Sequence, residues 1–215
     1  MRIVLAALAA IALVGCGSLS GTADPDSDAP EASIAGAGRF TQAATYGETL
    51  TLWRSAEDVN AWIGARFEYD MSRAMRLSET QRQSNGRMPI LTPEEFFAAP
   101  RGMCVDLSRF AVETLRAIDP RARAAYVMIE FDPVSVSGNT LRRHWVATFE
   151  NEGGRYFFAD SKRPGHIAGP YASTQEFITD YARYRGRTIV SFREAASYER
   201  QARTPAAKQA RGERP

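Results

Sequence analysis

The sequence predicts an α+β fold in which helices pack against an antiparallel sheet, and three observations predict it. Apolar residues recur at helical spacing through the first half of the chain. From about residue 123 the pattern changes to short segments rich in β-branched and aromatic residues. One more helical segment then precedes a final apolar run. Helices first and a meander of strands second is the order typical of α+β proteins.

The first helix is predicted from its start signal and its apolar face. Ser55 opens a capping-box-like pattern, which satisfies backbone N–H groups that a helix start leaves without partners. Val59, Trp62 and Ile63 then fall on one face. We expect this helix to end near Tyr69.

Two further helices precede the strands. Thr92 with Pro93 at the first helical position begins a short helix. A longer one begins at Cys104 and stops at Asp119, because a proline follows there. Its buried face is predicted to consist of Leu107, Phe110, Ala111, Thr114, Leu115 and Ile118. Cys104 is therefore expected at the N-terminus of a buried helix.

Three segments read as strands: "RAAYVMIEF", "HWVATF" and "RYFFA", the last two separated by the turn residues "NEGG". Ser173 and Glu176 are cap partners for a helix to Tyr184 that follows them. The run "TIVSF" predicts a final strand.

Composition indicates one domain with appendages. The 215 residues are 44% hydrophobic and 24% charged, and a net charge of +2 gives no reason to expect a nucleic-acid partner. We predict a signal peptide over 1–16, a flexible tether over 17–39 that is rich in Gly, Ser, Ala, Pro and Asp, a domain over 40–198 and a disordered basic tail over 199–215.

The N-terminus indicates export and lipid attachment. Arg2 precedes the run "IVLAALAAIALV", which is too short to span a bilayer. The run ends in Leu-Val-Gly-Cys, which resembles the bacterial lipobox, where the cysteine, here Cys16, is acylated with lipid such as palmitate. Gly17 follows where lipoproteins kept at the inner membrane usually have Asp. This resemblance implies an outer-membrane lipoprotein facing the periplasm. An ordinary secretory signal with an incidental cysteine is the alternative.

If lipid consumes Cys16, Cys104 is the only thiol of the mature chain, in an oxidising compartment. Such a thiol is either a buried apolar group or a nucleophile. The expected position at a helix N-terminus favours thiolate and a lowered pKa. Gly102 allows a tight turn or a close approach to the sulfur, although an ordinary turn glycine would look the same.

A thiolate nucleophile needs a general base, and the chain contains two histidines. His144 opens a predicted strand, whereas His166 lies in the loop "KRPGHIAGP". A five-residue hairpin loop over 150–154 would place His144 directly opposite Asp160, close enough for the carboxylate to orient the imidazole. His144 is the favoured base. His166 remains open as a loop residue that contacts substrate or replaces His144 as the base.

The segments "GMCVDLSRFAVETLRAIDPRARAAYV" and "HWVATFENEGGRYFFAD", in this order, resemble the transglutaminase-like superfamily over Thr92 to about Asp160. That resemblance implies a papain-like core with Cys104 as nucleophile, His144 as base and Asp160 as the residue that orients the base. The superfamily includes transglutaminases, peptidases, amidases and members without activity.

"TPEEFFAAPRGMCVD" is more weakly similar to bacterial transglutaminase-like cysteine proteinases, some of which need calcium. Asp106 occupies the acid of that motif, and a first-turn carboxylate stabilised by the helix dipole is the alternative for it. We predict no cofactor and no metal ligands, with calcium as a minor alternative. For the oxyanion, the Cys104 backbone N–H is one donor, and Tyr69 or Trp62 is the candidate second donor, as the superfamily sometimes arranges.

The sequence thus predicts a lipid-anchored envelope enzyme, a cysteine protease or amidase that hydrolyses amide bonds through a Cys-His-Asp catalytic triad and a thioester. Its substrate would be an envelope protein or a peptidoglycan peptide within reach of the tether. Amine transfer, as in transglutaminases, is one alternative. A noncatalytic binding or assembly lipoprotein with a buried Cys104 is the other.

Overall fold

The computed structural model describes residues 27–31, 39–81, 88–136 and 138–199. The predicted signal peptide with Cys16 and the tail from residue 200 lie outside the described residues, as does most of the predicted tether. None of the helices in the described ranges has the length and hydropathy needed to cross a membrane.

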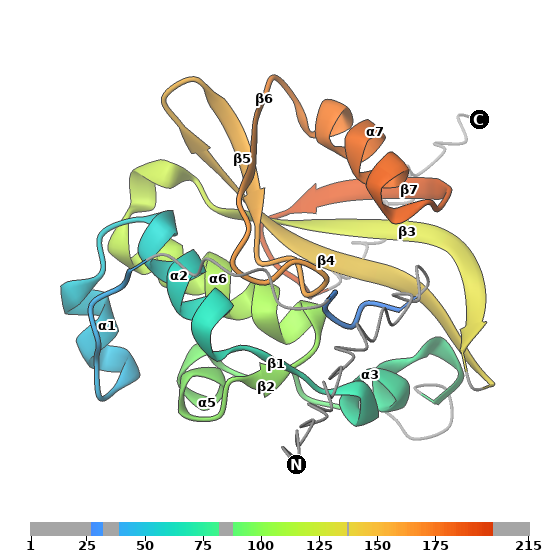
Figure 1. The fold of residues 1–215 in the computed structure, drawn as a ribbon, viewed down its shortest axis with the longest axis horizontal. Coiled ribbons are helices and arrows are strands. Elements are labelled where there is room, and N and C mark those ends of the chain that lie inside the picture. The colour runs from blue at the N-terminus through green and yellow to red at the C-terminus, as the bar shows by residue number, and fades with distance from the viewer. Residues whose placement is uncertain (1–26, 32–38, 82–87, 137, 200–215) are drawn as a thin grey trace, which may run out of the picture.

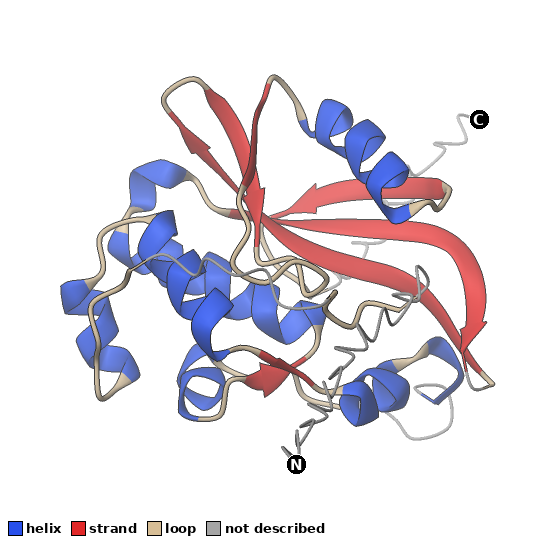
Figure 2. Ribbon diagram, viewed as in Figure 1, coloured by secondary structure: helices blue, strands red, loops and turns tan. Residues whose placement is uncertain are grey.

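The fold is α+β, as predicted, with an antiparallel sheet of five strands. The sheet order is β6-β5-β4-β3-β7 (Figure 2). Its strands are β3 (Ala125–Val136), β4 (Asn139–Asn151), β5 (Gly154–Phe158), β6 (Ala168–Tyr171) and β7 (Ile189–Ala195). The sequence predicted four of these segments; β6, short and containing Gly and Pro, was missed.

The helices lie mainly before the sheet in sequence, as Figure 1 shows. They are α1 (Tyr46–Leu52), α2 (Ala56–Arg66), α3 (Met71–Leu77), α5 (Pro93–Ala98), α6 (Cys104–Ile118), a 3-10 turn η1 (Pro120–Ala122) and α7 (Thr174–Arg185). Two-residue strands β1 (Glu68–Tyr69) and β2 (Arg101–Gly102) pair in parallel beside them. The predicted starts of α2, α5, α6 and α7 are confirmed to within one residue.

Each face of the sheet has its own apolar core, because alternate residues of a strand point to opposite faces. One face packs against α6, and α1, α2 and α5 pack against α6 in turn, where rings such as Trp62 and Phe110 lie with centroids 4.7 Å apart. The other face packs against α7, where Phe157 of β5 stacks on Phe177 at 3.8 Å. The chain thus has helices on both faces of β4, which places residues from α6 and α7 near that strand.

Candidate active site

Cys104 is the first residue of α6, where the sequence placed it. The turn into the helix is fixed by Asp106, whose carboxylate accepts a hydrogen bond from the Met103 backbone N–H at 3.1 Å. Gly102 permits this turn, because an added Cβ would lie 2.9 Å from the Cβ of Asp106. The thiol is free of any disulfide and is fully buried.

His144 lies on β4 and is also fully buried. It pairs in register with Ile129 of β3, and its imidazole stacks on the ring of Tyr181 from α7, 5.9 Å between centroids and 16° between planes. The Nε2 atom of His144 lies 2.9 Å from Oδ1 of Asp160. The strand and α7 therefore hold the ring between them, with one nitrogen bonded to a carboxylate.

The route by which Asp160 reaches His144 differs from the predicted one. The hairpin between β4 and β5 has a two-residue loop, Glu152 and Gly153, because Asn151 pairs with Gly154. This register is one residue away from the expected one and would put Asp160 on the opposite face from His144 in a regular strand. Instead β5 ends at Phe158, and Ala159 takes a positive φ of 56°. The prediction of the pair was right, and its hairpin geometry was wrong.

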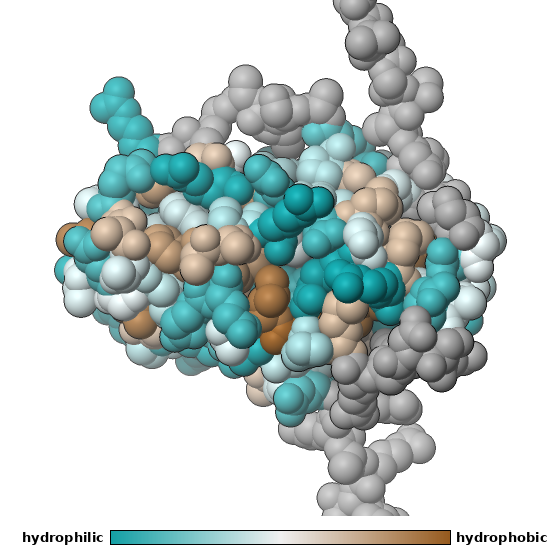
Figure 3. All heavy atoms as spheres, turned by 90° about the horizontal axis from the view of Figure 1, so that it is seen from below, coloured by the Kyte–Doolittle hydropathy of each residue, from teal (hydrophilic) through white to brown (hydrophobic). Residues whose placement is uncertain are grey.

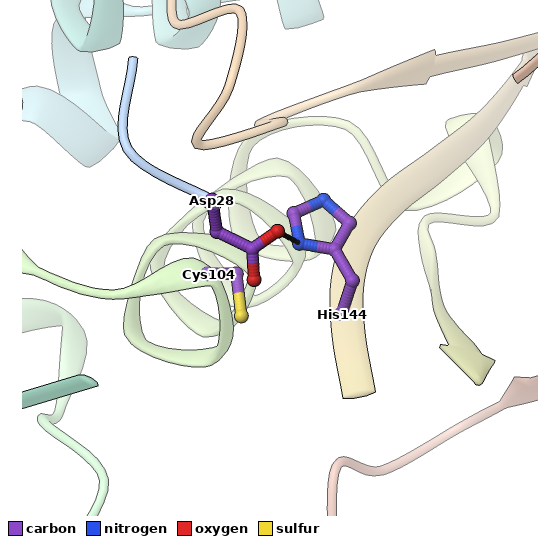
Figure 4. Close-up of side chains that lie close together, drawn as sticks. All are labelled: Asp28, Cys104 and His144. Carbon is purple, nitrogen blue, oxygen red and sulfur yellow. Dashed lines mark ion pairs between the residues drawn. The ribbon is translucent and has the colours of Figure 1, made fainter. Parts of the chain in front are cut away.

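Asp28 enters the same site from the N-terminal segment. Its carboxylate, the thiol of Cys104 and a ring nitrogen of His144 lie within 4.8 Å of one another. Figure 4 shows the carboxylate of Asp28 beside the imidazole and over the sulfur. Oδ1 of Asp28 is 3.2 Å from Nδ1 of His144, which is ion-pair distance, but the two groups are not aligned as a hydrogen bond.

Two side chains of α7 complete the cluster. The hydroxyl of Tyr181 donates to Oδ2 of Asp160 at 2.9 Å, and the guanidinium of Arg185 donates to that hydroxyl at 3.1 Å. Arg185 also donates to Oδ1 of Asp28 at 3.0 Å. The Lys162 backbone N–H donates to Asp160 at 3.0 Å. Asp160 is thus held by three donors and Asp28 by a buried cation.

The charges of this cluster determine the protonation of His144. Burial opposes a charged imidazole, but Asp28 first, then Tyr181 and Asp160, favour it, and the pKa of His144 is raised well above 6.5. Burial likewise opposes a charged Asp28, yet His144 and Arg185 hold the pKa of that carboxyl well below its usual range. The arrangement as folded is an imidazolium between carboxylates.

The thiol of Cys104, unlike His144 and Asp28, is held in its uncharged form. Burial raises the pKa of Cys104 and Asp28 raises it further, although His144 and the Trp145 backbone N–H act to lower it. The lowered pKa expected from the helix N-terminus is therefore wrong for the thiol in this buried state, because desolvation and a neighbouring carboxylate outweigh the helix. With Asp28 in place, Cys104 is a neutral thiol.

The sulfur, nitrogen and oxygen atoms of Cys104, His144 and Asp28 are donor types that zinc accepts. A fixed cation already occupies this position, however, since Arg185 donates to the same Oδ1 of Asp28 that faces His144. A second cation would meet that guanidinium at close range. A metal ion therefore fits this cluster poorly.

Asp106, which the resemblance connected with calcium, faces a guanidinium. Its buried carboxylate receives Nε of Arg73 at 2.7 Å and a second nitrogen at 2.8 Å. It also accepts the backbone N–H groups of Leu91 at 2.9 Å and Met103 at 3.1 Å. Its oxygens therefore already have four donors, and its contacts bind α3 to the start of α6.

The other residues singled out from the sequence lie at different distances from the Cys104 cluster. Tyr69 lies beside the site, where burial and the charge of Asp28 raise the pKa of its phenol. Trp62 is in the aromatic core, stacked on Phe97 at 5.1 Å. His166 lies in the turn that its N–H closes onto the Arg163 carbonyl, outside the Cys104 cluster. Tyr69 interacts electrostatically with Cys104, whereas Trp62 belongs to the aromatic core.

Sequence reasoning missed three residues of the cluster: Asp28, Tyr181 and Arg185. A tyrosine on a helix face gives no sign in the sequence that its hydroxyl, here that of Tyr181, bonds to a carboxylate. Asp28 was assigned to the tether, because its neighbours carry almost nothing to bury. No local pattern distinguishes Asp28 or Arg185 from other charged residues, since the ion pairs of Asp28 with Arg185 and His144 join residues more than 100 positions apart.

A groove runs from the site along α3 and the ends of β3, β4 and β7. Asp28, Tyr69 and Met103 line it near Cys104, and its further lining includes Glu130, Arg142, Arg143, Trp145 and Arg193. Figure 3 shows one face of the molecule on which hydrophilic residues alternate with small apolar areas.

No family model, no curated protein and no solved structure matches this chain.

Proposed function

We propose that the chain is a thiol enzyme of transglutaminase-like type that acts on amide bonds of proteins or peptides. One observation carries the proposal: a cysteine at the start of α6 lies beside a histidine whose other ring nitrogen is bonded to a carboxylate. Nucleophile, base and orienting acid in this order are what acyl transfer through a thiol requires.

In the proposed reaction Cys104 loses its proton to solvent, so that a thiolate lies beside the imidazolium of His144, and the sulfur attacks the carbonyl carbon. The oxyanion would receive the Cys104 backbone N–H, a donor that the helix start leaves without an intrahelical partner, and the hydroxyl of Tyr69. His144 then gives its proton to the departing amine, which leaves a thioester on Cys104. Asp160, held by Tyr181, keeps the imidazole in position while His144 gives up its proton.

Water then attacks the thioester and restores the thiol, so that the net reaction is hydrolysis. We favour hydrolysis over amine transfer, because small bacterial proteins that this sequence resembles are commonly proteases. An amine in place of water would give a new amide by the same steps.

We further propose an envelope lipoprotein anchored through Cys16, with envelope proteins or peptidoglycan peptides as substrates. Metabolic labelling with alkyne-palmitate should attach the label to Cys16 of the full chain. The Cys16→Ser variant should carry no label.

The test is the pH dependence of Cys104 alkylation. The protein is the soluble mature chain, which we define as residues 16–215 with Cys16→Ser, so that Cys104 is its only thiol. A thiol coupled to His144 should give an iodoacetamide rate profile that changes in His144→Ala and stays unchanged in His166→Ala. Identical profiles in all three chains, following a free thiol with a pKa near 8.5, would contradict the enzyme proposal.

One observation favours the second candidate, a noncatalytic binding lipoprotein: Cys104 is fully buried in this structure. If the thiol is only a core group, it should react no faster than global unfolding allows, at every pH and in every variant that stays folded.

A further inference from the structure

Residues 27–31 lie on the candidate active site although the segment contains no large apolar side chain. Ser27 is 8% exposed, and its carbonyl accepts a hydrogen bond from Arg185 at 3.3 Å. At the other end of the segment, the Glu31 backbone N–H donates to the Lys162 carbonyl at 3.2 Å. Figure 1 shows this segment beside the loop that follows β5. Polar contacts to the site, and not burial of apolar surface, hold it there.

Asp28 is the side chain that enters. Its carboxylate occupies the space between the thiol of Cys104 and Nδ1 of His144 (Figure 4). A substrate carbonyl must come to the same place, since it has to reach the sulfur while its leaving amine reaches the imidazole. Occupation by Asp28 and occupation by substrate therefore exclude each other.

The negative charge of Asp28 also takes the place of the Cys104 thiolate, which is the charge that catalysis needs. With the segment seated, the imidazolium of His144 is balanced by Asp160 on one side and by Asp28 on the other, while Arg185 neutralises part of the excess. If Asp28 leaves, the negative charge opposite His144 can be supplied by the thiolate of Cys104. Seating the carboxylate favours a neutral thiol, and removing it favours the reactive pair.

We propose that residues 27–31 are a built-in occupant of the active site, which blocks Cys104 until the segment is displaced. This inference rests on the proposed function for its consequence, because a blocked nucleophile matters only if Cys104 is one. The occupancy itself is independent of the reaction. Displacement exposes the thiol in the groove lined by Tyr69 and Met103, where a peptide chain has access to it.

The first experiment measures alkylation of Cys104 by iodoacetamide in the soluble mature chain and in Asp28→Ala. Because a small reagent reacts only with the open form, the rate is proportional to the open fraction. Removing the Asp28 carboxylate should raise the rate at least about ten-fold at neutral pH and shift the profile to lower pH. Glu152→Ala, in the distant β4–β5 turn, is the control for loss of one acidic side chain and should label like the parent.

The groups that face Cys104 in this profile are His144, Asp28 and Tyr69, together with the Trp145 backbone N–H. Equal rates and equal profiles for the parent and Asp28→Ala, with both chains folded by circular dichroism, would overturn the proposal. A loss of the folded signal in Asp28→Ala would leave the second experiment to decide.

The second experiment detects the seated segment directly. Asp28→Cys puts a thiol where the carboxylate lies within 4.8 Å of the sulfur of Cys104, so mild oxidation should form an intramolecular disulfide that peptide mapping identifies. Ala29→Cys is the matched control, since it has the same chain freedom one residue away. A bond that forms at least about ten-fold faster from position 28 than from position 29 supports seating. Equal rates would overturn it.

The two proposals fail in different ways. If Asp28→Ala accelerates labelling but His144→Ala in that background changes nothing, the occupant is real and the thiol enzyme is not. If labelling of the parent is already fast and dependent on His144, and Asp28→Ala does not change it, the enzyme proposal stands and the occupant does not.

Discussion

Arg73→Met should destabilise the domain strongly, because it leaves the carboxylate of Asp106 buried without its cation. The Arg73 side chain is 10% exposed and that of Asp106 is 0% exposed, with two guanidinium–carboxylate contacts at 2.7 and 2.8 Å. Removing one partner of a buried pair costs about 3–5 kcal/mol. Asp106 keeps the backbone N–H groups of Leu91 and Met103, so the lower end, about 3 kcal/mol, is expected.

The assay is urea unfolding of the soluble mature chain, followed by circular dichroism. A loss of about 3 kcal/mol corresponds to a fall of the midpoint by about 1–1.5 M urea, and the melting temperature should fall by about 6–12 °C. The double variant Arg73→Met with Asp106→Asn should lose less than the sum of the single variants, because each change removes a charge that the other leaves unpaired.

Arg101→Met is the matched control for the loss of a guanidinium near the same helix start. Arg101 pairs with Asp70 at 3.8 Å, and its side chain is 62% exposed. An exposed pair of this kind contributes under about 1 kcal/mol. If Arg73→Met and Arg101→Met unfold at the same urea concentration, the reasoning that the buried pair anchors α6 is refuted.

Three further predictions concern the site and its support. Tyr181→Phe removes the 2.9 Å bond to Asp160 and should cost about 1–3 kcal/mol in urea unfolding, and an unchanged midpoint would contradict the role given to the hydroxyl. Gly102→Ala should cost about 1–3 kcal/mol by overpacking, whereas Gly47→Ala, where an added Cβ meets nothing within 4 Å, should be neutral or slightly stabilising by the same measurement. His144 has a raised pKa in the fold, so the contribution of its charge to stability is complete below about pH 6.5 and is lost as the pH rises through the folded pKa. The difference in unfolding free energy between the parent and His144→Gln should therefore shrink from pH 6 upward. A difference that grows with pH would contradict this sign.

The sequence by itself determined four of the helix starts, four of the five strands of the main sheet, and which thiol and imidazole to single out. Helix starts such as Thr92 depend on hydrogen bonds within a few residues, so they can be read locally: the Thr92 hydroxyl accepts from the Glu95 N–H at 3.2 Å, as its pattern predicted. Strand composition located β3, β4, β5 and β7 in the same way. Cys104 and His144 could be singled out because thiols and imidazoles are few in this chain.

Only the tertiary structure decided how these residues meet. A loop shorter than predicted shifted the hairpin register by one residue, and the positive φ of Ala159 returned Asp160 to His144. Such a compensation depends on packing against α7, which no short window of sequence contains.

Asp28 is the clearest case of the same limit. Its segment has the composition of a linker, and its position is set by Arg185 and His144, groups more than 100 residues away in the chain. Local sequence encodes short-range hydrogen bonds and periodicity, whereas a buried charge cluster is encoded jointly by all of its members. The protonation of Cys104, and with it the state of the candidate active site, therefore belongs to the fold and not to any one segment.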